Sequence, residues 1–159
     1  MKIIKFAKSI IILILVTSCS NVEKPNSINN TNGYDSEYYK NLALNKGDTS
    51  AYYQLNLNYI DSPSETFLYT ALIMANKYEY HLAYLNVYEI LTDNNHAEGV
   101  SELENIDKKT RILALEYLKR GAEKGNKDCK YILGKHYVEG KYIEKDIKLG
   151  NTLILESEK

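Results

Sequence analysis

The chain contains few residues that could carry out chemistry. Its two cysteines, Cys19 and Cys129, are far apart, and its three histidines are His81, His96 and His136. A zinc site needs histidines or cysteines at close spacing, such as a pair at i and i+4, and none of these residues is so placed. The sequence also has no glycine-rich phosphate loop and no Gly-x-Ser-x-Gly elbow. We therefore expect no metal, no cofactor and no catalytic residue.

Cys19 is the side chain whose surroundings favour a covalent modification. Three lysines among the first eight residues precede an unbroken apolar run at residues 10–16, which is too short to span a bilayer. A basic start followed by such a run is typical of an export signal. The run ends with two small residues directly before the thiol, in the order Val16-Thr17-Ser18-Cys19.

This ending resembles the lipobox of bacterial lipoproteins. The resemblance implies that residues 1–18 are a signal peptide and that Cys19 receives diacylglycerol and fatty acyl chains such as palmitate. Two or three acyl chains hold a protein on a membrane stably, whereas one chain binds reversibly. Because Ser20 replaces the aspartate that often retains such proteins at the inner membrane, we expect a lipid anchor in the outer membrane, facing the periplasm. The alternative is an ordinary secretory signal with an incidental cysteine.

The rest of the chain divides into a polar segment and a domain. Residues 19–33 are rich in Asn and Ser and show no apolar periodicity, which predicts a flexible tether after the lipid. Residues 34–159 remain for one globular domain. Without the three signal lysines, 17 basic residues face 21 acidic ones, a net charge of about −4 that argues against a nucleic-acid partner. Cys129 alone cannot form a disulfide within the domain.

Helical spacing of apolar residues runs through the domain, and almost no stretch alternates between apolar and polar. Ser62-Pro63-Ser64-Glu65 has the pattern of a helix start. The helix that follows would carry its apolar residues on one face: Phe67, Leu68, Ala71, Leu72 and Ala75. A break at Asn76-Lys77 and a second helix to about Leu91 complete this pair. We therefore expect an all-α fold.

The domain also contains an internal repeat. One constant offset makes six positions identical, pairing Tyr39 with Tyr117, Lys46-Gly47 with Lys124-Gly125, Tyr53 with Tyr131, Leu55 with Leu133 and Tyr59 with Tyr137. In a weaker middle copy Ala75, Ala83 and Val87 follow Ala43, Ala51 and Leu55 at a second, shorter offset. The pattern predicts helical hairpins whose first helix ends near a glycine. A small residue, Ala51, Ala83 or Cys129, then lets the two helices approach closely.

The copy from Ala114 to Leu149 resembles the Sel-one-like repeats, which are relatives of the tetratricopeptide repeats. The matching residues are Ala114, Tyr117-Leu118, Arg120, Ala122, Gly125, Leu133-Gly134, Tyr137, Gly140, Ile143 and Asp146. Tyr142 departs from a usual loop glycine, Cys129 from an alanine, and the segment after Lys148 from the whole pattern. The resemblance implies a short right-handed α-solenoid of about three helical hairpins, whose usual work is to present a curved surface to another protein.

Tyrosine is the unusual component, with 15 residues against two phenylalanines and no tryptophan. Tyr80, Tyr84 and Tyr88 recur every four residues, and tyrosine rings suit protein interfaces. We predict that they contact a partner, together with His96 in a long loop or ragged helix at residues 93–106. The alternative is that the tyrosines fill seams between helices. Cys129 lies on such a seam, where a thiol acts as a small apolar filler.

The lipoprotein and repeat resemblances together imply a non-enzymatic role. Small Sel-one-like lipoproteins are similar to immunity proteins that neutralise effector toxins from competing bacteria, phospholipases among them. The expected partner is thus another protein, with the membrane reached through the lipid on Cys19. One alternative is an envelope scaffold or adaptor for cell-wall or signalling proteins. A β-lactamase-like hydrolase is a third reading, although such family members have repeats stapled by paired cysteines.

Overall fold

The computed structural model describes residues 35–61, 65–92, 103–104 and 106–159. The predicted signal peptide, Cys19, the predicted tether, residues 62–64 of the predicted helix start and His96 all lie outside these residues. Residues 34–159 form one compact unit. Of the segment at 93–106, Leu103 is buried, and its backbone oxygen accepts a hydrogen bond from Arg111 Nε at 2.7 Å.

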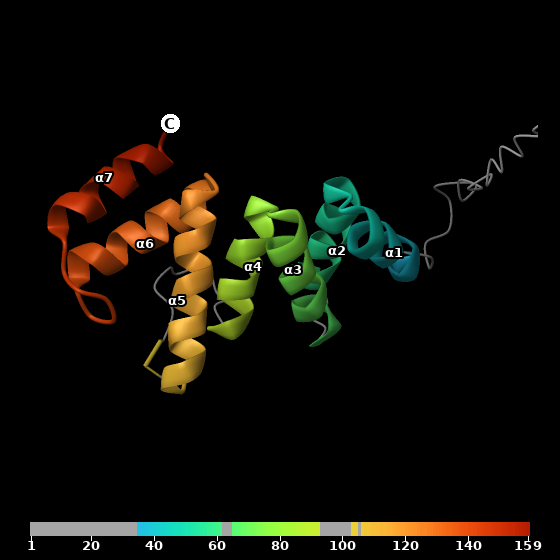
Figure 1. Cartoon of the computed structure of the whole chain (residues 1–159), viewed down its shortest axis with the longest axis horizontal. Helices are drawn as coiled ribbons and strands as arrows, with labels where there is room; N and C mark the ends of the chain where they lie inside the picture. Colours follow the sequence, from blue (N-terminus) through green and yellow to red (C-terminus); the bar gives the residue numbers. More distant parts are fainter. Residues whose placement is uncertain (1–34, 62–64, 93–102, 105) are drawn as a thin grey trace, which may run out of the picture. The chain divides into compact units, whose positions relative to one another are not determined.

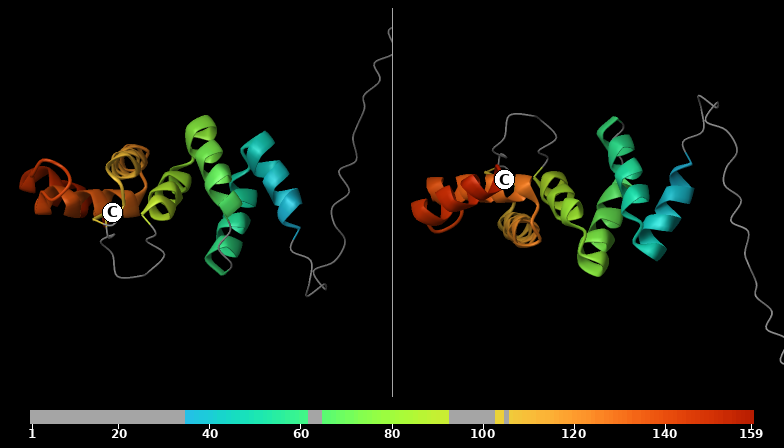
Figure 2. Two further views of the ribbon diagram at one scale, coloured as in Figure 1. Left: turned by 90° about the horizontal axis from the view of Figure 1, so that it is seen from below. Right: turned by 90° about the horizontal axis from the view of Figure 1, so that it is seen from above.

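The described residues form seven α-helices and no strand, which confirms the all-α prediction (Figure 1). The helices are α1 Ser36–Lys46, α2 Thr49–Asp61, α3 Glu65–Tyr78, α4 His81–Leu91, α5 Lys108–Glu123, α6 Lys127–Glu139 and α7 Ile147–Ser157. Each helix packs on the next one along the chain, and α1 also packs on α3. The views from below and from above in Figure 2 show the same order. Among the described residues no helix has both the length and the apolar character to cross a membrane.

The turns inside the pairs α1–α2, α3–α4 and α5–α6 share one backbone conformation. Gly47 and Gly125 have φ angles of +67° and +87°, and Glu79 takes the same left-handed region with a φ of +54°. This region costs a residue with a side chain roughly 1–2 kcal/mol, which is why glycine is preferred there. The predicted glycine turn is therefore present in the first and third pairs, while the middle pair makes it with a glutamate.

The second helix of the first and third pairs begins in the same way. The Asp48 side chain accepts a hydrogen bond from the Ala51 backbone N–H at 2.9 Å, and the Asn126 side chain accepts one from Cys129 N–H at 2.8 Å. These side chains satisfy backbone donors that a helix start otherwise leaves unpaired. The small residues Ala51, Ala83 and Cys129 are all buried, as the repeat predicted.

A second set of small residues lies on the first helix of each pair, at the repeat-equivalent positions Ala43, Ala75 and Gly121. A Cβ atom added to Gly121 would lie 2.5 Å from Cys129 Sγ, so the helices α5 and α6 cross without room for a side chain there. The thiol of Cys129 fills this seam. Its burial there raises the pKa of the thiol far above the ordinary value, which keeps it protonated.

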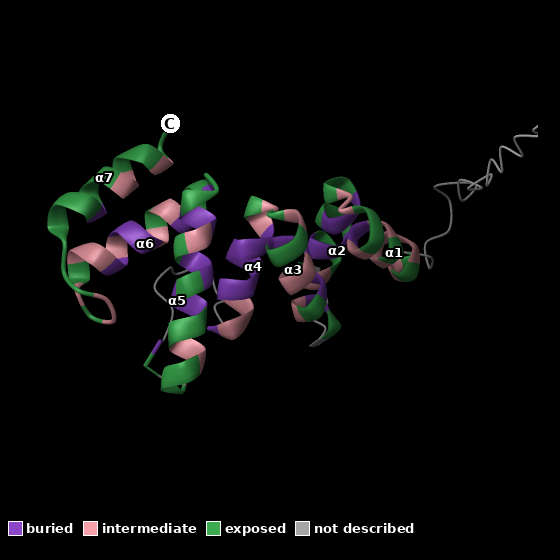
Figure 3. Ribbon diagram, viewed as in Figure 1, coloured by how far each residue is buried: buried purple, intermediate pink, exposed green. Residues whose placement is uncertain are grey.

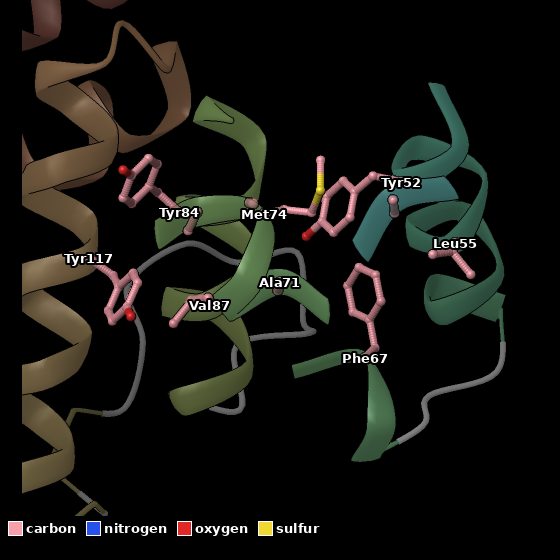
Figure 4. Packing of buried hydrophobic residues seen from close by; sticks show 11 residues of the cluster. Tyr52, Leu55, Phe67, Ala71, Met74, Tyr84, Val87 and Tyr117 are labelled. Atoms are coloured by element: carbon pink, nitrogen blue, oxygen red, sulfur yellow. The ribbon is translucent and has the colours of Figure 1, made fainter. Parts of the chain in front are cut away.

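The apolar core is richest around α4, which is buried over most of its surface, whereas α7 is mostly exposed (Figure 3). The predicted inward face of α3 is correct at Phe67, Ala71 and Ala75, which are buried. In the close view of Figure 4, the ring of Tyr52 on α2 lies against the ring of Phe67, with centroids 5.4 Å apart. Aromatic rings thus join the first helix pair to the second.

The segment after Lys148 forms the regular helix α7 although it departs from the repeat pattern. Asp146 caps it by accepting a hydrogen bond from the Leu149 backbone N–H at 2.9 Å. A Cβ atom on Gly150 would lie 2.6 Å from the backbone oxygen of Gly134, and one on Gly134 would lie 2.7 Å from that of Gly150. The helices α6 and α7 therefore cross backbone to backbone at these two glycines.

Candidate protein-binding surfaces

The predicted tyrosine stripe on α4 lies in the core. Tyr84 and Tyr88 are fully buried, so the prediction that they contact a partner is wrong, and the alternative of a seam filler fits their packing. The physical reason is that α4 packs on both α3 and α5, which leaves no free face for its aromatic rings. Tyr80 is partly buried and packs its ring edge-on against Tyr52 at 5.6 Å. His96 lies outside the described residues.

Tyr84 belongs to a closed network that we name the α3–α5 junction, formed by Asn76, Tyr84, Tyr117 and Arg120. The Arg120 guanidinium donates from Nη1 to Asn76 Oδ1 at 2.9 Å and from Nη2 to the Tyr84 hydroxyl at 3.3 Å. Its carbon centre lies 5.0 Å from the Tyr84 ring centroid, a distance at which cation and ring attract. Asn76 Nδ2 donates to the Tyr117 hydroxyl at 2.6 Å. Polar and aromatic groups thus fill this junction, and Figure 4 shows the rings of Tyr84 and Tyr117 between α4 and α5.

The equivalent place after the next helix pair is open. A groove of about 370 Å³ lies between α5 and α7 over α6, and we name it the α5–α7 groove. It is lined by Lys119, Ala122, Glu123, Lys130, Leu133, Tyr137, Leu149, Leu153 and Glu156. The lining combines apolar residues with two lysines and two glutamates, so the groove offers apolar surface and both signs of charge.

Lys130 crosses this groove to α7. Its Nζ atom lies 2.8 Å from Glu156 Oε2, and the hydrogen bond from Lys130 lowers the pKa of the Glu156 carboxyl. The offset that pairs Leu55 with Leu133 also pairs Tyr52 with Lys130, and the middle copy has Tyr84 at this position. The same repeat position therefore holds a tyrosine in the first two pairs, and a partly exposed ion pair replaces the buried ring at the third.

A second exposed surface lies on α2 and consists of Tyr53, Leu57 and Ile60, which we name the α2 stripe. Their spacing of i, i+4 and i+7 places them on one helix face. Their exposed fractions are 46%, 39% and 66%. No charged residue occurs from Thr49 to Ile60. The stripe is thus a continuous apolar helix face without a charge along that stretch of its own helix.

At the position equivalent to Tyr53, the other two helix pairs have either a buried residue or an exposed residue beside a charge. Leu85 on α4 corresponds to Tyr53 and is only 6% exposed, because it packs in the core around α5. Tyr131 on α6 also corresponds to Tyr53 and is 45% exposed, but the Lys135 ammonium lies 5.5 Å from its ring centroid. The uncharged exposed stripe is therefore a property of α2 rather than of the repeat in general.

Burial shifts the pKa values of two titratable side chains in the domain, His136 and Glu89. Burial lowers the pKa of His136, and its Nε2 atom lies 3.1 Å from the Tyr88 hydroxyl. Burial raises the pKa of Glu89 on α4 to about 7, against the opposing effect of a hydrogen bond from Asn86. The described part of the chain has no cluster of three or more His, Cys, Asp or Glu residues that could hold a metal ion. Ionisation of these groups makes the stability of the domain depend on pH.

Sequence reasoning missed both exposed surfaces, although signals for them exist. The α2 stripe shows in the spacing of Tyr53, Leu57 and Ile60 together with the absence of charge beside them. The α5–α7 groove shows in the change from tyrosine at positions 52 and 84 to lysine at 130, once the copies are aligned. Neither signal is contained in the number of tyrosines alone.

No protein-family model, no curated protein and no solved structure matches this chain.

Proposed function

We propose that the chain is a non-enzymatic protein-binding module that a lipid on Cys19 tethers to the cell envelope. In this proposal the helix pairs are Sel-one-like hairpins arranged as a short right-handed α-solenoid. The support is the shared turn geometry at Gly47, Glu79 and Gly125, the buried small residues of each pair, and the sequential packing of the helices. Repeats of this kind stack and leave extended surfaces for partners.

The observation that carries a binding function is the α2 stripe. Full burial of a large exposed apolar side chain contributes roughly 1.5–3 kcal/mol, and the partly exposed Tyr53, Leu57 and Ile60 would each gain a part of this from a covering partner. Surface patches of this kind are typical of interaction sites. A protein partner fits best, since a complementary apolar helix or strand face can cover three residues spaced along one helix.

The partner we propose is an effector toxin of a competing bacterium, such as a phospholipase, which the module would bind and block in the periplasm. The export signal, the lipobox-like ending and the acidic domain favour a protein held at the outer membrane where such a toxin arrives. Such a blocking role requires tight contact with the toxin and no catalytic residue in the module.

The experiment compares the wild-type strain, a deletion strain and deletion strains that carry variants. Replacing Tyr53 and Ile60 by serine should weaken partner capture by about 30-fold or more, because these two exposed anchors can together contribute about 2 kcal/mol or more at an interface. Tyr131→Ser is the matched control, since Tyr131 occupies the same repeat position and is equally exposed.

The readouts are capture from an envelope extract by the lipidated full chain and survival beside toxin-secreting sister cells. The deletion strain and the stripe variant should both become sensitive, while Tyr131→Ser should protect like wild type. Equal survival of all strains would contradict the immunity proposal. Capture of the cell's own envelope proteins without any toxin, lost in the stripe variant, would instead favour the scaffold alternative.

A further inference from the structure

The α5–α7 groove occupies the place where the domain elsewhere buries a tyrosine ring. Tyr52 follows the small residue Ala51 and packs toward α3, and Tyr84 follows Ala83 and packs beside α5. Lys130 follows Cys129 and reaches α7. The same position on the second helix of each pair thus faces the next first helix. The third pair has a lysine instead of a ring at this position, and the ring of Tyr137 forms part of the groove wall.

The size and lining of the groove suit an aromatic ring. Its volume is about 370 Å³, and an apolar cavity of about 150 Å³ already holds a benzene molecule. Leu133, Leu149 and Leu153 supply aliphatic contacts, and Ala122 leaves space because its side chain is short. The groove therefore has the room and the apolar surface that Lys130 does not use.

The charged residues of the groove suit a ring with a hydroxyl group. At the α3–α5 junction the Arg120 guanidinium donates a hydrogen bond to the Tyr84 hydroxyl. In the α5–α7 groove Lys130 and Glu156 pair with each other at 2.8 Å, and Lys119 and Glu123 add a second donor and a second acceptor to the lining. A phenol hydroxyl both donates and accepts, so it matches this mixture better than an anion or a cation would.

We propose that the α5–α7 groove binds a tyrosine side chain presented by a partner protein, whose ring takes the place that Tyr52 and Tyr84 occupy in the earlier helix pairs. The ring lies on the leucines, and the hydroxyl reaches the lysine and glutamate side chains. This site is separate from the α2 stripe, so a failed test of one leaves the other unaffected.

The first test titrates N-acetyl-tyrosinamide into the purified full chain and follows the methyl NMR signals of Leu133 and Leu153. Saturable shifts should appear with a dissociation constant on the order of 1 mM, the range expected for a ligand of this size. N-acetyl-phenylalaninamide should bind about two- to fivefold more weakly, because it lacks the hydroxyl. Shifts that rise linearly without saturation, or equal affinity for the two ligands, would overturn the proposal.

The second test fills the groove from within. Lys130→Tyr restores the residue of the other two copies and should reduce N-acetyl-tyrosinamide binding at least tenfold while the protein stays folded. Lys130→Arg keeps the charge and an aliphatic stem, and should bind within threefold of wild type. Retained binding in Lys130→Tyr, or an unfolded Lys130→Tyr variant, would show that the groove does not accept a ring at this position and would overturn the proposal.

Sedimentation of the wild-type full chain and the Lys130→Tyr variant identifies the source of the ring. The wild-type chain should sediment as a monomer over the micromolar range. A concentration-dependent dimer that Lys130→Tyr dissociates would make a second copy the occupant, and would overturn the assignment to a different partner protein.

Discussion

The α3–α5 junction and the α5–α7 groove hold equivalent places in the internal repeat, yet one is closed and the other open. At the junction, Tyr84 and Tyr117 fill the space and Arg120 ties their helices to Asn76 through hydrogen bonds. At the groove, Lys130 takes the position of Tyr84 and pairs with Glu156 at 2.8 Å. The difference teaches that one residue position can fill the core in one copy and leave an open groove in the next.

The largest expected effect tests this difference directly. Tyr84→Ala should lower the free energy of unfolding by about 3–5 kcal/mol, because it leaves a cavity in a packed core and removes the hydroxyl partner of Arg120. Lys130→Ala, the equivalent change at the groove, should cost less than about 1 kcal/mol, since its ion pair is partly exposed. Urea unfolding followed by circular dichroism measures both. Similar losses of unfolding free energy for the two variants would contradict the difference between the α3–α5 junction and the α5–α7 groove.

A second prediction concerns what holds α7 in place beside the open groove. Gly150→Ala should destabilise the domain by about 1–3 kcal/mol, because the new Cβ would meet the Gly134 backbone oxygen and force α6 and α7 apart. The clash must outweigh the roughly 0.5–1 kcal/mol that alanine normally gains over glycine in a helix. Asn151→Ala, at an exposed neighbouring position, should change the free energy of unfolding by at most about 0.5 kcal/mol. A stabilised Gly150→Ala would show that α7 packs more loosely than the crossing indicates.

A third prediction concerns Glu89 on the buried helix α4, whose ionisation should make the stability of the domain depend on pH. Burial raises the pKa of Glu89 to about 7, whereas its ordinary value is 4.5. A folded-state pKa above the unfolded value means that this group's stabilising contribution is complete below pH 4.5 and is lost as pH rises through 7. Glu89→Gln should therefore be more stable than wild type by about 1–2 kcal/mol at pH 8 and nearly equal to it at pH 4.

Thermal unfolding of both proteins from pH 4 to pH 8 measures this difference. Lys119→Gln is the control, because Lys119 is an exposed charged residue on α5. Its difference from wild type should stay flat across this range. A stability difference for Glu89→Gln that is largest at pH 4 would contradict the burial of the carboxyl.

The smallest expected effect compares the turns of the three pairs. Glu79→Gly should raise the free energy of unfolding by about 0.5–1 kcal/mol, because glycine adopts the left-handed conformation without strain. Part of this gain is offset by the loss of the ion pair to Lys124 at 2.7 Å. Gly125→Ala is the converse, with a φ of +87° and open space around the new Cβ, and should lose about 1 kcal/mol. Chemical denaturation at high salt, which screens the ion pair, should enlarge the gain of Glu79→Gly.

The sequence alone predicts much of this domain because the repeat fixes local geometry. The repeat offset pairs Tyr53 with Tyr131, and their exposed fractions of 46% and 45% agree almost fully. Leu55 and Leu133 agree as well, both being buried in the core. Helix existence and turn positions follow from such local signals, since spacing and caps act within a few residues.

The environment of α4 could not be predicted in the same way. A spacing of four residues places Tyr80, Tyr84 and Tyr88 on one helix face but does not say what covers that face. Packing of α3 and α5 on either side of α4 decides it, and that depends on contacts between residues far apart in the chain. The backbone crossing at Gly134 and Gly150 has the same origin, because a glycine in a helix does not indicate which neighbour approaches it.

The crossing of α6 and α7 also limits how this protein can change over evolutionary time. A tight contact between two side chains can survive a larger residue on one side if the other side becomes smaller. Gly134 and Gly150 have no side chain to give up, so neither can compensate for growth of the other. In a library that samples every substitution, these two positions should tolerate the fewest replacements, and no second change on the facing helix should rescue them.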